Sequence, residues 1–245
     1  MRIFFSPKVT VALLVCMIIF FSCKDDSYLK TIPPAANQSF VEEFDTATAA
    51  LSRGWKFINV SEPHGSGVWQ NGGNVNPLFS GFSNNGSYAG FIGTDYTSTS
   101  AAQGIISNWL LSPEITMKNG DKIIFYTRSQ TYFDPTLLDT TDYGNSLEIR
   151  INTSNDLNNV GIGKDVGNFT TALLTINSSM AFSSTVSPDP NAYPTKWTRF
   201  EATISTLPNA IKGKFGFRYY VTDGGSNGNG SGVGVDSVVF KSAGY

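Results

Sequence analysis

Residues that could carry out covalent or metal chemistry are few in this sequence of 245 residues. His64 is the single histidine, and it lies in the turn-rich stretch SEPHGSG. A serine nucleophile needs a base and an orienting acid, and no G-x-S-x-G elbow is present. A hydrolytic zinc site needs several His or Cys ligands, which this chain does not supply. The sequence therefore favours a non-catalytic protein, with a glycosidase that uses two carboxylates as the alternative.

Two acidic residues lie among apolar neighbours in strand-like segments. Glu42 shares a face with Phe40 and Phe44, and Asp236 lies in the run GVGVDSVVF. Neither segment has a Lys or Arg on the same face as its acid. A buried carboxylate needs a partner, because its unpaired charge is costly away from water. A bound cation and backbone hydrogen bonds are both possible partners, and the sequence leaves the two alternatives open.

Aromatic residues in polar, turn-rich segments form a second group of candidates. Aromatic rings stack on the C–H faces of sugars, while nearby amides and carboxylates bond the hydroxyl groups. The alternative is that these rings pack over the end of the fold. Trp55, Trp109 and Trp197 adjoin strand-like apolar runs, so we expect those three in the core. The candidates for ligand binding are Trp69, Tyr96, Tyr132, Tyr143 and Tyr193.

Short strands must position these residues. Alternating or continuous apolar patterns predict strands at 121–128, 146–152, 197–204, 214–221 and 233–240. No segment after residue 22 shows a convincing helical period, the best candidate being 47–53, and Gly, Asn, Ser, Thr and Pro fill the connections. This pattern predicts an all-β sandwich or barrel. Loops as long as 130–145, 178–196 and 223–232 are often functional, and the last is expected to be a flexible hairpin loop.

The N-terminal segment has the form of an export signal. Arg2 and Lys8 precede an uncharged apolar run at 9–21, which is shorter than the roughly 20 residues of a membrane span. Ser22 and Cys23 follow directly, so residues 1–22 resemble a bacterial lipoprotein signal. The usual leucine three residues before the cysteine is replaced by Phe20. The resemblance implies that Cys23 becomes the lipidated first residue of the mature protein.

Three charged residues after the cysteine extend this resemblance. Lys24, Asp25 and Asp26 resemble the tag that sends some lipoproteins to the outer face of the outer membrane. Residues 23–38 then form a Pro-containing flexible tether to a domain at 39–245. The alternative is an ordinary secreted protein with an incidental cysteine.

Charge indicates little affinity for nucleic acid. Removal of the signal takes away Arg2 and Lys8, which leaves 15 basic and 19 acidic residues, a net charge of −4. The sequence has no basic patch, so we expect no nucleic-acid partner. We expect the protein to contact the membrane through its lipid anchor.

A series of segments identifies a family resemblance. In order, they are EEFD (42–45), RGW (53–55), SNWLLSPEI (107–115), KNGDKIIFYTR (118–128) and GVGVDSVVF (232–240). The series resembles the cleaved-adhesin or choice-of-anchor J domain, a jelly roll related in shape to MAM domains and carbohydrate-binding modules. The resemblance implies a jelly-roll β-sandwich of two antiparallel sheets, exposed at the cell surface and often calcium-binding.

The resemblance also implies that the first and last strands lie side by side. Glu42 and Asp236 would then approach one another and repel unless a cation intervenes. Calcium suits carboxylates and carbonyl oxygens, so we expect a calcium site at these two acids, with Asp45 as a third ligand. The expected function is adhesion or capture of an extracellular glycan or matrix protein. A glycoside hydrolase on the same scaffold and a structural assembly component are the alternatives.

Overall fold

The described part of the chain is its folded C-terminal unit. The computed structural model describes residues 36–244, apart from 84–86, 89 and 137, within a compact unit at Ala36–Tyr245. The predicted signal, Cys23 and the Lys24–Asp26 tag lie outside these residues. Among the described residues, no helix is both long enough and apolar enough to cross a membrane.

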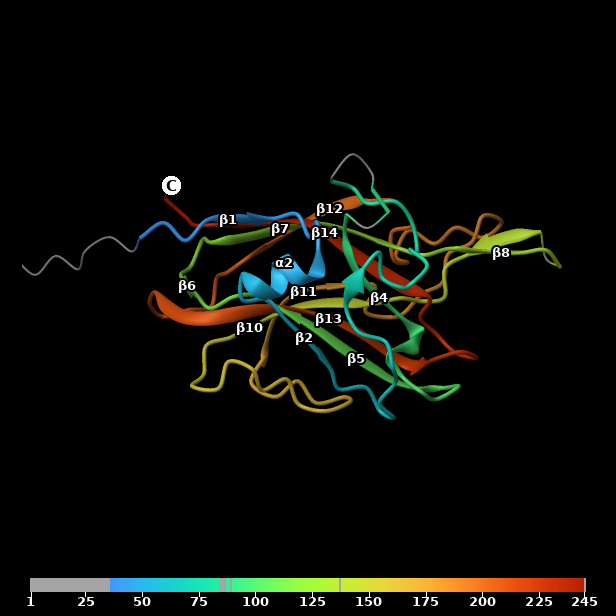
Figure 1. Ribbon diagram of the computed structural model, residues 1–245, viewed down its shortest axis with the longest axis horizontal. Coiled ribbons are helices and arrows are strands. Elements are labelled where there is room, and N and C mark those ends of the chain that lie inside the picture. Colours follow the sequence, from blue (N-terminus) through green and yellow to red (C-terminus); the bar gives the residue numbers. More distant parts are fainter. Residues whose placement is uncertain (1–35, 84–86, 89, 137, 245) are drawn as a thin grey trace, which may run out of the picture. The chain divides into compact units, whose positions relative to one another are not determined.

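Two antiparallel sheets form a jelly-roll β-sandwich (Figure 1). The first sheet has the order β12 (Thr198–Thr203), β7 (Lys122–Ser129), β14 (Gly232–Lys241), β4 (Ile92–Asp95) and β3 (Gln70–Asn71), and β1 (Phe40–Glu42) also pairs with β14. The second sheet has the order β11 (Thr171–Ile176), β10 (Leu147–Asn152), β13 (Ile211–Gly224), β5 (Gly104–Leu111) and β2 (Lys56–Asn59), and β6 (Ile115–Met117) also pairs with β13. The predicted all-β jelly roll is therefore confirmed, and the first and last strands do pair, with Glu42 opposite Val238.

The core lies between the sheets, where the alternating residues meet. On β13, Phe215, Phe217, Tyr219 and Val221 are all fully buried, as the period-2 pattern predicts. Phe217 contacts Phe125 of the facing sheet, with the ring centroids 4.9 Å apart. Side chains from both sheets therefore build one apolar layer, which holds the loops at each end in fixed positions.

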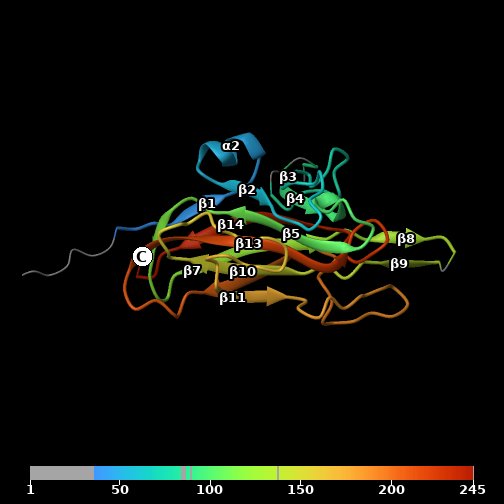
Figure 2. The same ribbon diagram turned by 90° about the horizontal axis from the view of Figure 1, so that it is seen from below.

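The candidate helix at 47–53 is α2 (Ala47–Ser52), which lies outside the two sheets in Figure 2 and packs on the core through the fully buried Ala50. Thr46 caps it by accepting a hydrogen bond from the Ala49 N–H at 3.1 Å. The helix ends at Arg53, and Gly54 follows with a φ of +95°, a conformation that favours glycine. This short helix carries the Arg53 side chain back toward β1.

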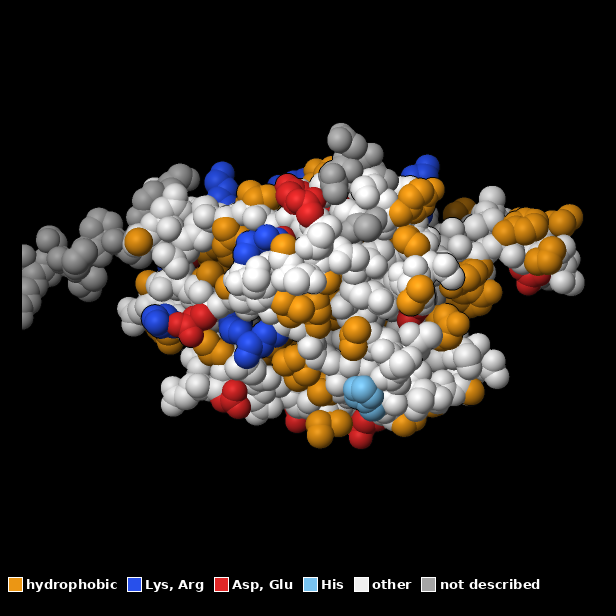
Figure 3. Space-filling model, viewed as in Figure 1, with side chains coloured by type: hydrophobic (Ala, Val, Ile, Leu, Met, Phe, Trp, Pro, Cys, Tyr) orange, Lys and Arg blue, Asp and Glu red, His pale blue; other side chains and the backbone are white. Residues whose placement is uncertain are grey.

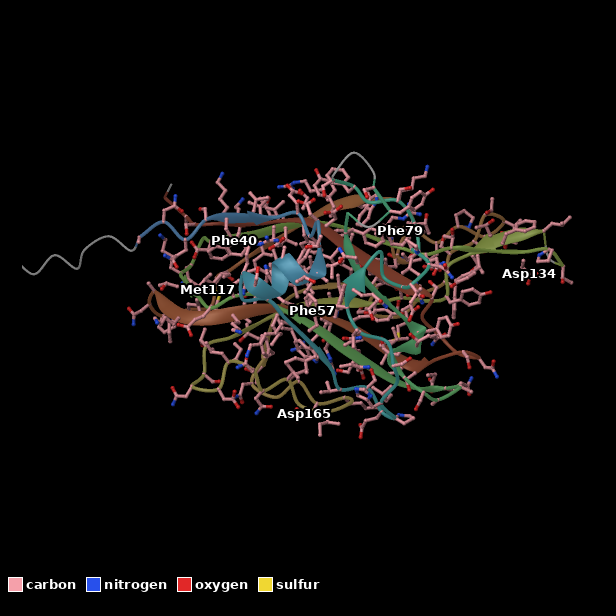
Figure 4. All side chains as sticks on the ribbon, in the orientation of Figure 1. Phe40, Phe57, Phe79, Met117, Asp134 and Asp165 are labelled. Atoms are coloured by element: carbon pink, nitrogen blue, oxygen red, sulfur yellow. The ribbon has the colours of Figure 1, made fainter. Side chains whose placement is uncertain are left out.

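The long segment at 130–145 contains a small hairpin of its own. Strands β8 (Tyr132–Asp134) and β9 (Asp139–Thr141) pair with each other and extend beyond the sandwich (Figures 1 and 2). Asp134 lies toward the outer end of this hairpin (Figure 4). The predicted hairpin at 223–232 is wrong, because β13 and β14 belong to different sheets and the segment crosses between them.

Candidate functional site

The predicted calcium ligands do not form one site. Glu42 is 2% exposed, and both of its carboxylate oxygens are bound by Arg53, through Nε at 2.8 Å and a terminal nitrogen at 2.5 Å. The Phe44 N–H adds a third hydrogen bond. The premise that Glu42 lacks a basic partner is wrong, because Arg53 comes from the end of α2 rather than from a strand. Asp45 is exposed.

Asp236 is fully buried and receives its hydrogen bonds from the protein. Its carboxylate accepts the backbone N–H groups of Phe82, Ser83 and Ser237 and the Ser83 hydroxyl, at 2.7 to 2.9 Å. Burial raises the pKa of Asp236 to about 6, against the lowering effect of these donors. Of the two partners that the sequence left open for Asp236, backbone hydrogen bonds are therefore the one observed.

A different acid lies beside Asp236. Ser237 donates its N–H to Asp236, and its hydroxyl lies 3.4 Å from Oε1 of Glu43. The other oxygen, Glu43 Oε2, is buried without a hydrogen-bond partner. Within the described residues, no group of three or more His, Cys, Asp or Glu side chains could hold a metal ion. Glu43 Oε2 is the open carboxylate oxygen beside Asp236, so Glu43 is a better candidate calcium ligand than Glu42 or Asp45.

Two of the five candidate aromatics belong to the interior. Trp69 is 1% exposed, because it adjoins the short strand β3 and packs into the main core. Tyr193 is also 1% exposed, and its hydroxyl lies 2.6 Å from the Thr127 hydroxyl on β7. Their prediction as ligand-binding residues is wrong, because both rings pack inward over the end of the fold, which was the alternative. Of the tryptophans expected in the core, Trp55 and Trp109 are buried, whereas Trp197 is half-buried.

The other three candidates line one pocket. Tyr96 comes from one segment and Tyr132 and Tyr143 from another, 130–145, and the three meet in a cavity of about 620 Å³, which we call the tyrosine pocket. The wall is completed by Phe182 and the crossing segment after β13. Its remaining lining residues are Gln103, Asp223, Gly225, Ser226, Asn227, Gly228, Asn229, Gly230 and Ser231.

Tyr132 and Tyr143 form the aromatic wall of the pocket. Their ring centroids are 5.7 Å apart and their planes meet at 65°, so the two rings present an edge and a face rather than a stack. Each ring remains 37% exposed. Burial raises the pKa of Tyr132 to about 12, and its hydroxyl donates to Oε1 of Gln130 at 2.9 Å. Tyr132 is therefore held in place while one side of its ring stays open.

Asn145 fixes the floor of the pocket. Its side-chain oxygen accepts from the Tyr219 hydroxyl at 2.8 Å and from the Ser231 and Gly232 N–H groups at 3.0 Å. The Gly230 N–H donates to the Tyr143 carbonyl. A Cβ at Gly230 would lie 2.6 Å from the Tyr219 hydroxyl, so no larger residue fits there. The crossing segment is thus tied to the segment that carries Tyr143.

A single helical turn places Tyr96. The 3₁₀ turn η3 (Tyr96–Ser98) begins at Asp95, whose carboxylate accepts the Thr97 N–H at 2.9 Å. Asp95 also accepts from the side chain of Asn74. The tyrosine ring is therefore set by a capped turn at the end of β4, a strand of the opposite sheet from β13.

Phe182 is one of the pocket residues that the sequence did not identify. Its segment attaches to the hairpin, because Asp142 accepts the Ser183 N–H and Asp139 accepts those of Thr185 and Val186. Phe182 is 51% exposed, which leaves its ring free for contact. The length of the 178–196 loop was the available signal. The amide side chains at 227 and 229 were signalled by the Gly/Asn-rich stretch itself.

The electrostatics of the tyrosine pocket are simple. Asp223 is the sole charged side chain among its described lining residues, and no Lys or Arg is present there. A glycosidase uses two carboxyl groups about 5 to 10 Å apart, which this lining does not supply. Phenols, amides and hydroxyls around an open aromatic wall can instead hold a polyhydroxylated ligand by stacking and hydrogen bonds.

Comparisons with known proteins identify the fold. No family model and no curated protein matches the chain. The K1 cleaved adhesin domain of Lys-gingipain from Porphyromonas gingivalis W83 is 20% identical, with a TM-score of 0.50 over 84% of this chain and 99% of that one. The K3 cleaved adhesin domain of the same protein is 17% identical, with a TM-score of 0.51 over 85% of this chain and 100% of that one. The chain therefore has the fold of these adhesin domains.

Proposed function

We propose that this protein is a non-catalytic, surface-exposed lipoprotein that binds an extracellular glycan in the tyrosine pocket. One observation carries the proposal: Tyr132 and Tyr143, which flank one hairpin, meet the distant Tyr96 around one cavity of about 620 Å³. Cavities of roughly 300–1,000 Å³ are typical of small-ligand sites. The adhesin-like fold agrees with a binding role.

The composition of the pocket favours binding over catalysis. Sugar rings present C–H faces to aromatic rings and hydroxyl groups to amides and carboxylates. The pocket supplies the first through Tyr132 and Tyr143, and the second through Asn227, Asn229 and Asp223. Hydrolysis of a glycosidic bond would require a second carboxylate beside Asp223.

A glycan array tests the proposal. The chain from residue 24 onward, which lacks the proposed signal and lipid site, is screened against glycans and matrix proteins. We expect glycan binding that Tyr132→Ala weakens by at least tenfold, about 1.4 kcal/mol.

Phe133→Ala is the matched control, because Phe133 is a 61% exposed aromatic on the same hairpin that does not line the pocket. Apolar side chains gather on this hairpin (Figure 3). Loss of partner binding in Phe133→Ala with normal binding in Tyr132→Ala would contradict the glycan site and favour docking of a protein on the hairpin.

The anchor is tested separately from the ligand. We propose that Cys23 is acylated, since acyl chains contribute about 0.8 kcal/mol per buried CH₂ and two or more hold a protein stably on a membrane. Cys23→Ala should release the protein from membranes or leave the precursor uncut. A cleaved Cys23→Ala protein that still sediments with membranes would contradict this anchor.

The tag is tested by surface exposure. Alanines at Lys24, Asp25 and Asp26 should preserve lipidation but protect the protein from protease added to whole cells. Unchanged proteolysis would show that these three residues do not direct the protein to the outer surface.

Calcium, as a structural ion, would bind through the open Oε2 of Glu43, and the adjacent Asp236 carboxylate would exchange some of its four hydrogen-bond donors for the ion. It would neutralise two partly or fully buried carboxylates beside Ser237. Bound calcium should raise the melting temperature in millimolar calcium relative to EDTA, because a ligand stabilises the state that binds it. Glu43→Gln should remove this rise, while the exposed Asp45→Asn serves as control. Equal melting temperatures in calcium and EDTA would exclude the ion.

A further inference from the structure

A second hollow adjoins the tyrosine pocket. Its volume is about 370 Å³, and it shares Tyr96 and Ser226 with the first. We call it the His64 hollow, and its other lining residues are Gly65, Ser66, Thr97, Thr99, Ser100 and Ala101. One side chain, Tyr96, therefore stands at the boundary of two hollows on the same surface.

The wall between the hollows is fixed by backbone contacts. The Gly65 N–H donates to the Ser98 carbonyl and the Gly67 N–H to the Thr97 carbonyl, each at 2.9 Å. A Cβ at Gly65 would lie 2.2 Å from the Thr97 carbonyl oxygen, so this approach requires glycine. His64 itself forms an isolated bridge with Thr99. The His64 hollow is thus built against the turn that carries Tyr96.

The shared boundary indicates an extended ligand. A ring stacked beside Tyr132 and Tyr143 would leave its neighbour in a chain next to Tyr96, and the next unit would enter the His64 hollow. The hydroxyls of Ser66 and Ser100 and the imidazole of His64 are hydrogen-bonding groups suited to sugar hydroxyls. A single sugar would leave the second hollow unused.

The charge of the residues around both hollows favours a neutral glycan over an anionic one. Their described lining residues include no Lys or Arg, and Asp223 contributes a carboxylate. Asp95 lies buried directly before Tyr96. A sulfated or carboxylated glycan would meet these negative charges with no lysine or arginine in the lining, which is unfavourable.

We propose that the site binds a neutral oligosaccharide whose chain runs from the tyrosine pocket across Tyr96 into the His64 hollow. This inference rests on the proposed function and adds the class and length of its ligand. Tyr96 contacts the middle of the bound chain, where the two hollows meet, and the Asp223 carboxylate disfavours anionic chains.

The test compares chain lengths. The probes are neutral gluco-, xylo-, manno- and galacto-oligosaccharides of one to six units, titrated calorimetrically into the chain from residue 24 onward. For the series that binds, we expect affinity to rise at least tenfold from one unit to four. Ser100→Trp places a large ring in the His64 hollow from an exposed position and should remove this gain without weakening the single sugar. Tyr132→Ala should weaken every length.

The outcomes separate the two proposals. Equal affinity at all lengths, with Ser100→Trp harmless and Tyr132→Ala damaging, would overturn the extended chain and leave the glycan pocket intact. Absence of binding by every probe, or binding unaffected by Tyr132→Ala, would overturn both. An unchanged melting temperature of Ser100→Trp confirms that the variant is folded.

Charge selection has its own pair of probes. The neutral polymer of the series that binds and its carboxymethylated form share a backbone, so we expect the carboxylated polymer to bind at least tenfold more weakly than the neutral one. Asp223→Asn should narrow that difference. Tighter binding of the carboxylated polymer by the unaltered protein would overturn the choice of neutral chains.

Discussion

The region around Asp236 and the tyrosine pocket differ in how much of their bonding capacity the protein itself uses. Asp236 is fully buried and accepts four hydrogen bonds. Glu42, on the paired strand β1, forms an ion pair with Arg53. In the pocket, Tyr132 and Tyr143 are each 37% exposed, and Phe182 is 51% exposed. Groups satisfied inside the protein stabilise the fold, whereas groups left open are available to a ligand.

The largest expected effect contrasts two tyrosines from the same candidate set. Tyr193→Ala removes a fully buried ring, so it should lower the free energy of unfolding by about 3–5 kcal/mol, as for other buried aromatics. Glycan affinity of the remaining folded protein should be unchanged. Tyr132→Ala should do the reverse, with a small loss of stability and a large loss of affinity. Urea unfolding and calorimetry measure both, and parallel effects in the two variants would break the comparison.

The second prediction concerns the pH dependence of stability at Asp236. Burial raises its pKa to about 6 in the folded protein, whereas the unfolded chain releases this proton near pH 4. This group therefore contributes stability that is fully present below about pH 4 and is lost as the pH rises through about 6. The contribution is roughly 2–3 kcal/mol at 1.4 kcal/mol per pKa unit.

Asp236→Asn removes the titration. In EDTA, the free energy of unfolding of the variant relative to the natural protein should increase between pH 4 and pH 7. A constant difference over that range would show that Asp236 is ionised throughout in the fold.

The third prediction concerns the Arg53–Glu42 pair. Arg53→Ala leaves the 2% exposed Glu42 carboxylate with a hydrogen bond from the Phe44 N–H but without its ion pair. The free energy of unfolding should therefore fall by about 2 kcal/mol. Glu42→Gln should lower the free energy of unfolding by less, because the neutral amide leaves no unpaired charge in the buried site. Equal losses in the two variants would show that packing of the Arg53 stem, rather than its charge, matters.

The smallest effect separates the ring from the hydroxyl in the pocket. Tyr132→Phe keeps the aromatic face and loses the hydrogen bond to Gln130, which lies among exposed groups. Glycan affinity should change by less than about threefold, well under the effect of Tyr132→Ala, because stacking uses the ring. A loss as large as that of alanine would mean that the hydroxyl contacts the glycan directly.

Local patterns predicted five strands well, missed others such as β5 and β11, and predicted the partners of individual side chains poorly. The predicted segment 214–221 lies within β13, and 233–240 lies within β14, since period-2 alternation is a property of the neighbouring residues alone. The partner of Asp236 is different in kind, because Ser83 lies 153 positions away along the chain. No spacing rule connects the two.

The candidate aromatics show the same division. All five occur in polar, turn-rich stretches of sequence, and that context was the same for Tyr193 and Tyr132. Tyr193 packs onto β7 beside Thr127, whereas Tyr132 lies at the base of a hairpin that extends past the sandwich. Loop composition identifies an aromatic residue but does not show whether its ring points into the core or toward solvent. That direction depends on which strand the loop packs against.

The sequence by itself determined strands β7, β10, β12, β13 and β14 and the aromatic residues within polar segments, because each depends on residues close together in the chain. The tertiary structure alone decided that Tyr96, Tyr132 and Tyr143 share a pocket, that Glu42 pairs with Arg53, and that Trp69 and Tyr193 are buried. Those outcomes depend on long-range contacts between two sheets and their loops, where each partner is chosen by three-dimensional packing rather than by sequence separation.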